Sequence, residues 1–228
     1  MIRHVFLDLD NTLMDFTGGE AAALRLTLRD MGVTPTDEMA HRYRDINLHH
    51  WQLLEQGLLT RPQVVVQRFD AFFREFALPC SGLEASRIYE AHLSAQHELL
   101  PGATELLKTL YPRYRLYLAS NGTKPVQNRR LADADLYRWF QGIFLSQDLG
   151  ADKPSELFFH QAFAAIEGFD SREAIIVGDS LTSDILGGRN AGILTCWFNP
   201  HKNTPQPDIV PHYEISSLAQ LPPLLETL

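Results

Sequence analysis

The stretch Val5-Phe-Leu-Asp-Leu-Asp-Asn-Thr12 combines an apolar run with two alternating carboxylates near the start of the chain. Its aliphatic and aromatic residues predict a buried strand over 5–9. Successive side chains of a strand point to opposite faces, so Asp8 and Asp10 are expected to share one face. Neighbouring carboxylates repel unless they share a proton or a cation, and Mg²⁺ suits this place because it prefers oxygen ligands. On its own, an Asp-x-Asp pair at a strand end is more typical of a turn or a cap.

The same strand character recurs along the chain. Apolar runs rich in β-branched and aliphatic residues occupy 5–9, 115–119, 143–146, 174–177 and 193–198. Segments of helical length and period separate the later runs, at 124–137, 155–168 and 182–191. Strands that alternate with such helices predict βαβ units, a parallel sheet and right-handed crossovers. A short strand over 213–215 and a helix over 217–226 are expected to close this domain.

One long helical block interrupts the alternation. After the first strand, apolar residues recur at helical spacing and no strand is predicted, while glycine- and proline-rich turns divide the block into about four helices. Phe69 and Phe72 belong to this pattern and are expected to pack in its interior. We therefore expect a core of residues 1–15 and 100–228. Residues 16–99 are expected to form a helical cap, a lid over the carboxyl end of the sheet.

Polar residues follow the other strands of the predicted sheet. They are Ser120 and Asn121 after the second strand, Lys153 before a proline at the mouth of a helix, and Asp179 and Asp184 after the fourth strand. The carboxyl ends of parallel strands lie at one edge of the sheet, where these residues would meet the first carboxylate pair. Each segment alone has an ordinary explanation as a turn, a solvated lysine or a helix N-cap. Their combination predicts metal-assisted phosphoryl transfer, because it joins cation ligands, a positive charge and phosphate-binding groups.

Composition narrows the remaining possibilities. The 228 residues suffice for one α/β domain with a modest insertion. The net charge of −8 argues against sequence-independent binding to the nucleic-acid backbone. Cys80 and Cys196 lack the spacing of a metal or redox site. The first residues do not resemble a signal peptide, and no apolar stretch has membrane-spanning length. We therefore expect a cytoplasmic protein, a monomer or homodimer, with no membrane or nucleic-acid partner.

In this order, the motifs resemble those of the haloacid dehalogenase-like (HAD) hydrolase superfamily. The superfamily's Asp-x-Asp-x-Thr corresponds to residues 8–12, its strand-end Ser or Thr to Ser120, its Lys to Lys153, and its Gly-Asp with a further Asp to residues 178–184. The helical block lies where type-1 caps are inserted. The resemblance covers essentially the whole chain. It implies a Rossmann-like catalytic core and an α-helical cap that governs substrate choice.

The resemblance also implies a mechanism. Asp8 would be the nucleophile that forms an aspartyl-phosphate, and Asp10 would protonate the leaving alcohol and then activate water. The dehalogenases of the superfamily lack this second aspartate, because a released halide needs no proton. Asp10 therefore favours a phosphatase over a dehalogenase.

The same resemblance implies a metal ion and a phosphate site. Mg²⁺, with Mn²⁺ as a substitute, would be held by Asp8, the backbone carbonyl of Asp10 and Asp179. Asp184 would act through water or by positioning Lys153. The phosphoryl oxygens would be bound by Ser120, Asn121, Lys153 and the backbone N–H groups after Asp8.

Parts of the helical block resemble a narrower group, the house-cleaning pyrimidine 5′-nucleotidases, and the segment Asn47-Leu-His-His-Trp51 is an example. This resemblance implies hydrolysis of nucleoside monophosphates such as dUMP, UMP and dTMP. Phe16 and Trp51 would stack on the nucleobase, and Asn47 is among the residues that would reach its polar edge. For Trp51, packing within the cap core is an equally good explanation.

Three alternatives remain open. Another small phosphate ester, such as phosphoglycolate or a sugar phosphate, predicts a cationic rather than an aromatic lining of the cap. A phosphoglucomutase-type transfer also uses Asp8 and Asp10 but needs a sugar-phosphate anchor that the sequence does not reveal. A non-catalytic binding module on the same fold is disfavoured, because no catalytic position is missing.

Overall fold

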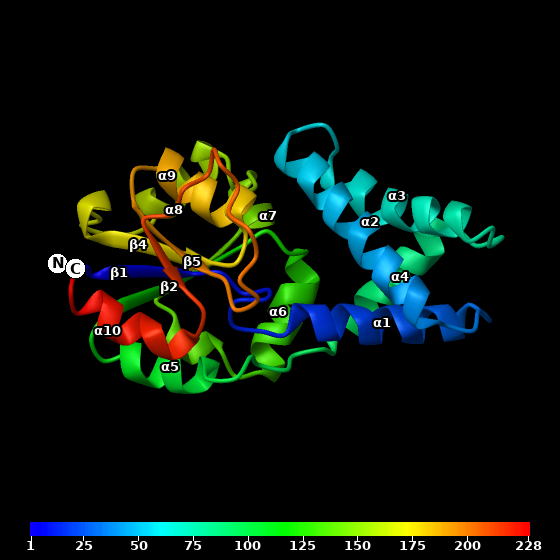
Figure 1. Ribbon diagram of the computed structural model, residues 1–228, viewed down its shortest axis with the longest axis horizontal. Coiled ribbons are helices and arrows are strands. Elements are labelled where there is room, and N and C mark those ends of the chain that lie inside the picture. Colours follow the sequence, from blue (N-terminus) through cyan, green and yellow to red (C-terminus); the bar gives the residue numbers. More distant parts are fainter. The chain divides into compact units, whose positions relative to one another are not determined.

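The computed structural model describes all residues from 1 to 228, and they form two compact units (Figure 1). The first unit comprises residues 1–15, 98–124 and 131–228, and it contains the sheet. The second comprises residues 16–97 and 125–130 and is entirely helical. None of the helices combines the length and apolar composition needed to cross a membrane.

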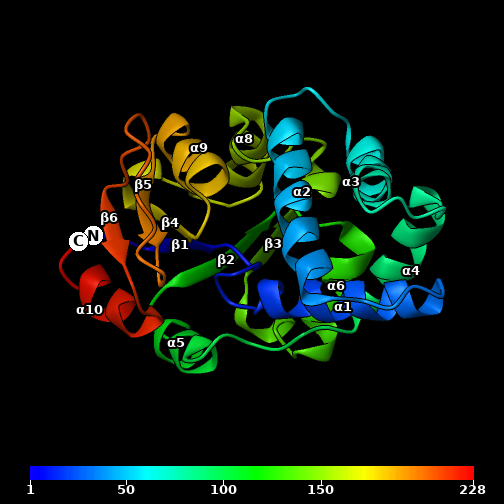
Figure 2. The same ribbon diagram turned by 45° about the vertical axis from the view of Figure 1, so that its right-hand side comes forward.

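Six parallel strands form one sheet in the order β3-β2-β1-β4-β5-β6 (Figure 2). Their bounds are β1 (His4–Leu7), β2 (Arg115–Ser120), β3 (Gly142–Leu145), β4 (Ala174–Gly178), β5 (Leu194–Phe198) and β6 (Tyr213–Ile215). The parallel α/β sheet predicted from the sequence is thus confirmed. The strand order reverses between β1 and β4, and open α/β sheets bind their ligands beside such a reversal, at the carboxyl ends of the strands.

The first strand is shorter than the predicted 5–9. It ends at Leu7, which pairs with Leu118 of β2 and Val177 of β4. The chain then turns sharply, since the N–H groups of Leu13 and Met14 both donate to the carbonyl oxygen of Leu9 at 2.9 Å. Both aspartates of the first motif therefore lie in the loop that follows the strand, not within the strand.

Helices cover both faces of the sheet (Figure 1). On one face, α5 (Ala103–Leu110) and α10 (Leu221–Leu225) pack into an aliphatic core. On the other, α8 (Glu156–Ala164) packs its phenylalanines against β1, β2 and β4, beside α9 (Leu186–Asn190). The remaining elements are α6 (Lys124–Asp133), which contributes residues 125–130 to the second unit, α7 (Ser146–Leu149), single 3₁₀ turns at Tyr137–Trp139, Ser171–Glu173 and Leu218–Gln220, and a π-helical turn at Leu181–Ile185.

The second unit is built from four helices. They are α1 (Phe16–Asp30), α2 (Asp37–Glu55), α3 (Arg61–Glu75) and α4 (Gly82–Ser94). Thr36 and Thr60 are the N-caps of α2 and α3: Thr36 Oγ1 accepts from the N–H of Met39 at 3.2 Å, and the N–H of Thr60 donates to Gln63 Oε1 at 2.8 Å. The interior is aromatic, and Phe69 and Phe72 are fully buried in it, as predicted.

Three polar side chains lie buried between these helices. The Asn47 amide donates to Glu20 Oε1 at 2.6 Å and accepts from Arg68 Nη1 at 2.8 Å. The Arg68 guanidinium also lies over the ring of Tyr89. Both sides of the Asn47 amide are therefore engaged within this unit, which does not support the prediction that Asn47 reaches the polar edge of a base.

Candidate active site

Lys153 is the centre of a buried polar cluster in the first unit. Its side chain is 2% exposed, and its Nζ donates to Asp8 Oδ1 at 2.7 Å, to Asp184 Oδ1 at 2.5 Å and to the carbonyl oxygen of Ala119 at 2.7 Å. These acceptors follow β1, follow β4 and lie near the end of β2, so three adjacent strands supply them. The structure therefore brings together, at the strand-order reversal, motifs that are separated by up to 176 positions in sequence.

Three carboxylates could hold a divalent cation. Oxygens of Asp8, Asp179 and Asp184 lie within 4.8 Å of one another. A set of hard oxygen ligands with excess negative charge fits Mg²⁺. Asp184 already accepts from Lys153 through Oδ1 and from the N–H of Ser180 through Oδ2, at 3.1 Å. Of the two roles predicted for Asp184, these contacts favour the positioning of Lys153.

Burial changes the protonation of this cluster. It raises the pKa of Asp8 from 3.8 to about 7, although Lys153 opposes the rise. Burial also raises the pKa of Asp179 well above its ordinary value, and the charge of Asp8 adds to that rise. For Lys153, Asp184 and Asp8 overcome the effect of burial and raise its pKa. One lysine offsets only part of the charge of three carboxylates, so the metal-free cluster favours proton uptake by Asp8 and Asp179.

Metal-free protein is expected to lose stability as the pH rises from about 4 to about 7. The folded-state pKa of Asp8 exceeds its unfolded value, so the stabilisation is complete below about pH 4 and is lost as the pH passes through about 7. The free energy of unfolding should fall by at most about 1.4 kcal/mol per pH unit for each proton that the folded state binds in excess of the unfolded state. Urea denaturation in EDTA across this range measures it. Mg²⁺ should reduce this dependence of the free energy of unfolding on pH, and so should Asp179→Asn. A free energy of unfolding in EDTA that does not fall as the pH rises would contradict the raised pKa of Asp8.

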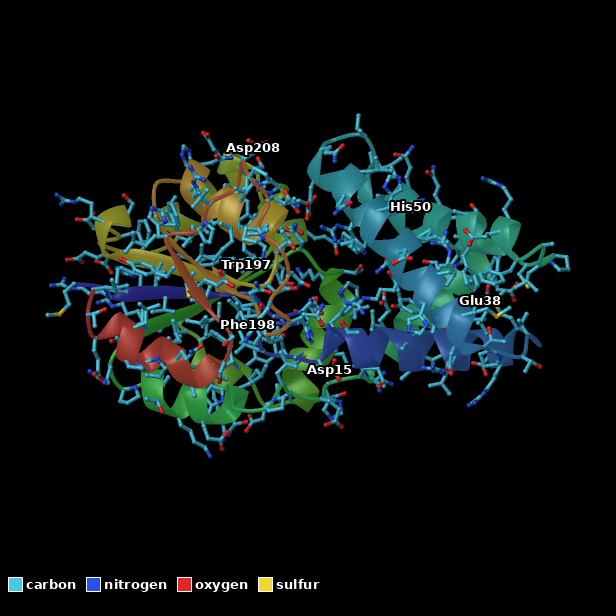
Figure 3. All side chains as sticks on the ribbon, viewed as in Figure 1. Asp15, Glu38, His50, Trp197, Phe198 and Asp208 are labelled. Atoms are coloured by element: carbon cyan, nitrogen blue, oxygen red, sulfur yellow. The ribbon has the colours of Figure 1, made fainter.

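Two side chains outside the cluster fix the position of Asp179. Thr12 Oγ1 accepts from its backbone N–H at 3.1 Å, and the Trp197 indole N–H donates to its carbonyl oxygen at 2.8 Å. Trp197 lies beside Phe198 at the end of β5 (Figure 3). This role of Trp197 was not predicted from the sequence, because no local pattern links an indole to a loop 18 residues earlier.

Gly178→Ala is expected to disrupt the site by steric overlap. A Cβ atom at position 178 would lie 2.1 Å from Asp184 Oδ2, and Asp184 is itself buried and bound to Lys153. We expect a loss of about 1–3 kcal/mol in the free energy of unfolding, together with weakened Mg²⁺ binding. Gly192→Ala is the matched control. It meets nothing within 4 Å and reports only the cost of a positive φ, about 1 kcal/mol. A loss no larger than that of Gly192→Ala, together with unchanged Mg²⁺ binding, would show that the overlap is unimportant.

The predicted phosphate-binding residues lie beside Lys153. Ser120 is buried at the end of β2, and its Oγ accepts from the N–H of Gly122 at 3.1 Å. The Asn121 amide contacts the backbone of Lys153. Asp10 is half-buried in the loop after β1, where it forms an isolated backbone bridge with Met14.

The two predicted base-stacking residues belong to the second unit. Phe16 is half-buried at the start of α1, with the Arg130 guanidinium 5.8 Å from its ring centre. Trp51 is half-buried on α2, with the Arg61 guanidinium 5.3 Å from its ring centre. Phe16 packs against the apolar core of the unit, whereas Trp51 is not part of that core.

Known proteins with similar sequences include a HAD-hydrolase and two pyrimidine 5′-nucleotidases. The Bacillus subtilis (strain 168) HAD-hydrolase YfnB is 38% identical, with 96% of this chain and 93% of that protein covered. Its crystal structure bound to magnesium matches with a TM-score of 0.94 over 98% of each chain. Two pyrimidine 5′-nucleotidases are also similar. PynA of Streptococcus pneumoniae (strain ATCC BAA-255 / R6) is 36% identical, with coverage of 96% and 93%, and YjjG of Escherichia coli (strain K12) is 32% identical, with coverage of 97% and 96%.

The family match itself spans residues 2–192, and so includes every motif residue of the buried cluster. Together with the relatives, it shows that this chain belongs to the haloacid dehalogenase-like hydrolase family.

Proposed function

We propose that the protein is a Mg²⁺-dependent phosphomonoesterase that acts through an aspartyl-phosphate at Asp8. The observation that carries this proposal is the buried ammonium of Lys153, held between Asp8 and Asp184 beside a third carboxylate. Such a site places an ammonium beside a carboxylate nucleophile, and a bound Mg²⁺ would supply the further positive charge that an anionic phosphoryl group needs there. Asp10 supports a phosphatase over a dehalogenase, because an alcohol leaving group needs a proton.

The proposed reaction has two displacements. An oxygen of Asp8 attacks phosphorus, the bond from phosphorus to the ester oxygen breaks, and Asp10 donates a proton to the departing alkoxide. Asp10 then takes a proton from water, which attacks phosphorus and releases phosphate and the Asp8 carboxylate. Lys153 and Ser120 hold the phosphoryl oxygens. When bound by Asp8, Asp179 and the carbonyl of Asp10, Mg²⁺ offsets the charge of the phosphoryl group.

We propose pyrimidine nucleoside 5′-monophosphates as the substrates and the helical unit as the cap that selects them. The names of the two nucleotidases and their identities of 36% and 32% support this proposal. Trp51 supports it as well, because it is a half-buried aromatic side chain outside the apolar core of its unit, and we propose that the ring face opposite the Arg61 guanidinium stacks on the base. We further propose that the enzyme works in the cytoplasm, as a monomer or homodimer.

A substrate panel tests the proposal. It compares kcat/KM for UMP, dUMP and dTMP with kcat/KM for phosphoglycolate, sugar phosphates and p-nitrophenyl phosphate, each with Mg²⁺ and with EDTA. Pyrimidine nucleotides should rank among the best substrates. Preference for phosphoglycolate or a sugar phosphate would overturn the proposed substrate class. Absence of turnover on every ester would overturn the proposed phosphatase activity.

Trp51→Ala examines base stacking separately. Loss of one stacking contact should lower kcat/KM for nucleotides by about 10-fold while leaving p-nitrophenyl phosphate hydrolysis within about twofold. His50→Ala, on the same helix (Figure 3), is the matched control.

A further inference from the structure

The position of Lys153 depends on a loop. Residue 153 lies between α7 and α8, and its side chain must present one nitrogen to three oxygens at once. A long lysine side chain is flexible, so burial of Nζ alone does not fix the backbone from which it extends. A small shift of that backbone would move Nζ away from Asp8.

The Asn121 side chain holds this backbone at two points. Its Oδ1 accepts from the N–H of Lys153 at 2.8 Å, and its Nδ2 donates to the carbonyl oxygen of Lys153 at 2.8 Å. Nδ2 also lies 3.4 Å from Ser183 Oγ, in the turn that carries Asp184. A backbone N–H can only donate and a carbonyl can only accept, so the orientation of the amide follows from its partners.

We propose that the Asn121 side chain is a positioning residue for Lys153, and that it acts on the reaction through Lys153 rather than by binding the phosphoryl group. This inference rests on the proposed phosphatase function. These two hydrogen bonds use the oxygen and one N–H of the side-chain amide, as one strand pairs with its neighbour. Aspartate would lose the donor and serine is too short to reach both groups, so asparagine is the residue type that this clamp requires.

The clamp links β2 to the loop that carries Lys153. Asn121 follows Ser120, the last residue of β2, so its own backbone is fixed by the sheet. The carbonyl of Ala119, which accepts from Lys153 Nζ, lies two residues earlier. The backbone and the ammonium of Lys153 are therefore both anchored to the same strand end, which sets the distance from Nζ to Asp8.

A double-mutant cycle tests the proposal on catalysis. Asn121→Ala, Lys153→Ala and the double variant are assayed with Mg²⁺ and p-nitrophenyl phosphate, for kcat and KM separately. Asn121→Ala should lower kcat by about 10- to 100-fold, as expected for a displaced catalytic group. In the Lys153→Ala background the same change should have almost no further effect. Full additivity of the two losses would overturn the proposal, because Asn121 would then act independently of Lys153.

Hydrogen–deuterium exchange tests the clamp without catalysis. The Lys153 amide should exchange at least about tenfold faster in Asn121→Ala, because its acceptor is gone. Ser155→Ala is the control in the same loop, since it removes only the cap of α8 and should leave both kcat and the Lys153 amide unchanged. Unchanged exchange in Asn121→Ala would overturn the clamp. If the wild-type protein hydrolysed no phosphate ester, the phosphatase proposal would fail, whereas the exchange measurement would still decide whether Asn121 holds Lys153.

Discussion

An Asp8→Asn variant is expected to lose Mg²⁺-dependent phosphatase turnover by roughly 10⁴-fold or more while it remains folded. Asparagine matches the shape of aspartate but is a poor nucleophile, and it removes one of the three carboxylates that could hold the cation. Initial rates with p-nitrophenyl phosphate measure the loss. Because a residue that acts within a catalytic set is nearly indispensable, activity within tenfold of wild type would exclude Asp8 as the nucleophile.

The stability of the same variant provides its control. Asp8 and Asp179 repel each other in the metal-free protein, and burial penalises the charge of each. Asp8→Asn removes one of these charges, so its melting temperature in EDTA should equal or exceed that of the wild type at about pH 7.5. Mg²⁺ should stabilise the wild type and have little effect on the variant. A large drop in melting temperature in EDTA would instead indicate that lost activity reflects misfolding.

Lys153→Met is expected to destabilise the fold by about 3–5 kcal/mol, because it leaves Asp8 and Asp184 buried without their positive partner. The loss should be largest near pH 8 and smaller near pH 5. Removal of the lysine raises the pKa values of Asp8 and Asp179 further, and protonated carboxyls need no counter-charge. Urea denaturation at the two pH values measures both effects, and phosphatase activity should fall with them.

Lys124→Met is the matched control for that prediction. Lys124 also pairs with an aspartate, Asp148, but both side chains are exposed. An exposed ion pair contributes about 0–1 kcal/mol, so this variant should unfold almost as the wild type does. Similar losses for the two lysines would mean that burial does not set the energetics of the Lys153 site.

The residues of the site were predictable from the sequence to different degrees. Asp8 and Asp179 follow apolar runs that the sequence predicts as strands of a parallel sheet, so their meeting at one edge follows from the topology. Lys153 is different. A lone lysine before a proline is normally solvated, and its burial depends on acceptors from three segments that are far apart in the sequence, which no local pattern shows. The hydrogen bonds between the Asn121 amide and the backbone of Lys153 could not be predicted for the same reason.

The fold shows a similar division. The strands and the four helices of the second unit follow from hydrophobic periodicity. Helix α5, by contrast, has only eight residues between two turn signals and was not predicted. Residues 125–130 belong to α6 yet pack with the helical unit, because Val126 joins the aromatic core of that unit. The sequence pattern of α6 is continuous, so the sequence alone does not reveal which of its residues pack with the second unit.

Chemical trapping of the phosphorylated enzyme tests the central claim most directly. Protein turning over its best substrate with Mg²⁺ is quenched, treated with borohydride, which reduces an aspartyl-phosphate to homoserine, and analysed by peptide mass spectrometry. The account predicts homoserine in place of Asp8, dependent on both substrate and Mg²⁺ and absent in Asp8→Asn. Homoserine at another position would contradict the assignment of Asp8 as the nucleophile. An unmodified Asp8 in an enzyme that turns over and accumulates a phosphorylated intermediate would also contradict it.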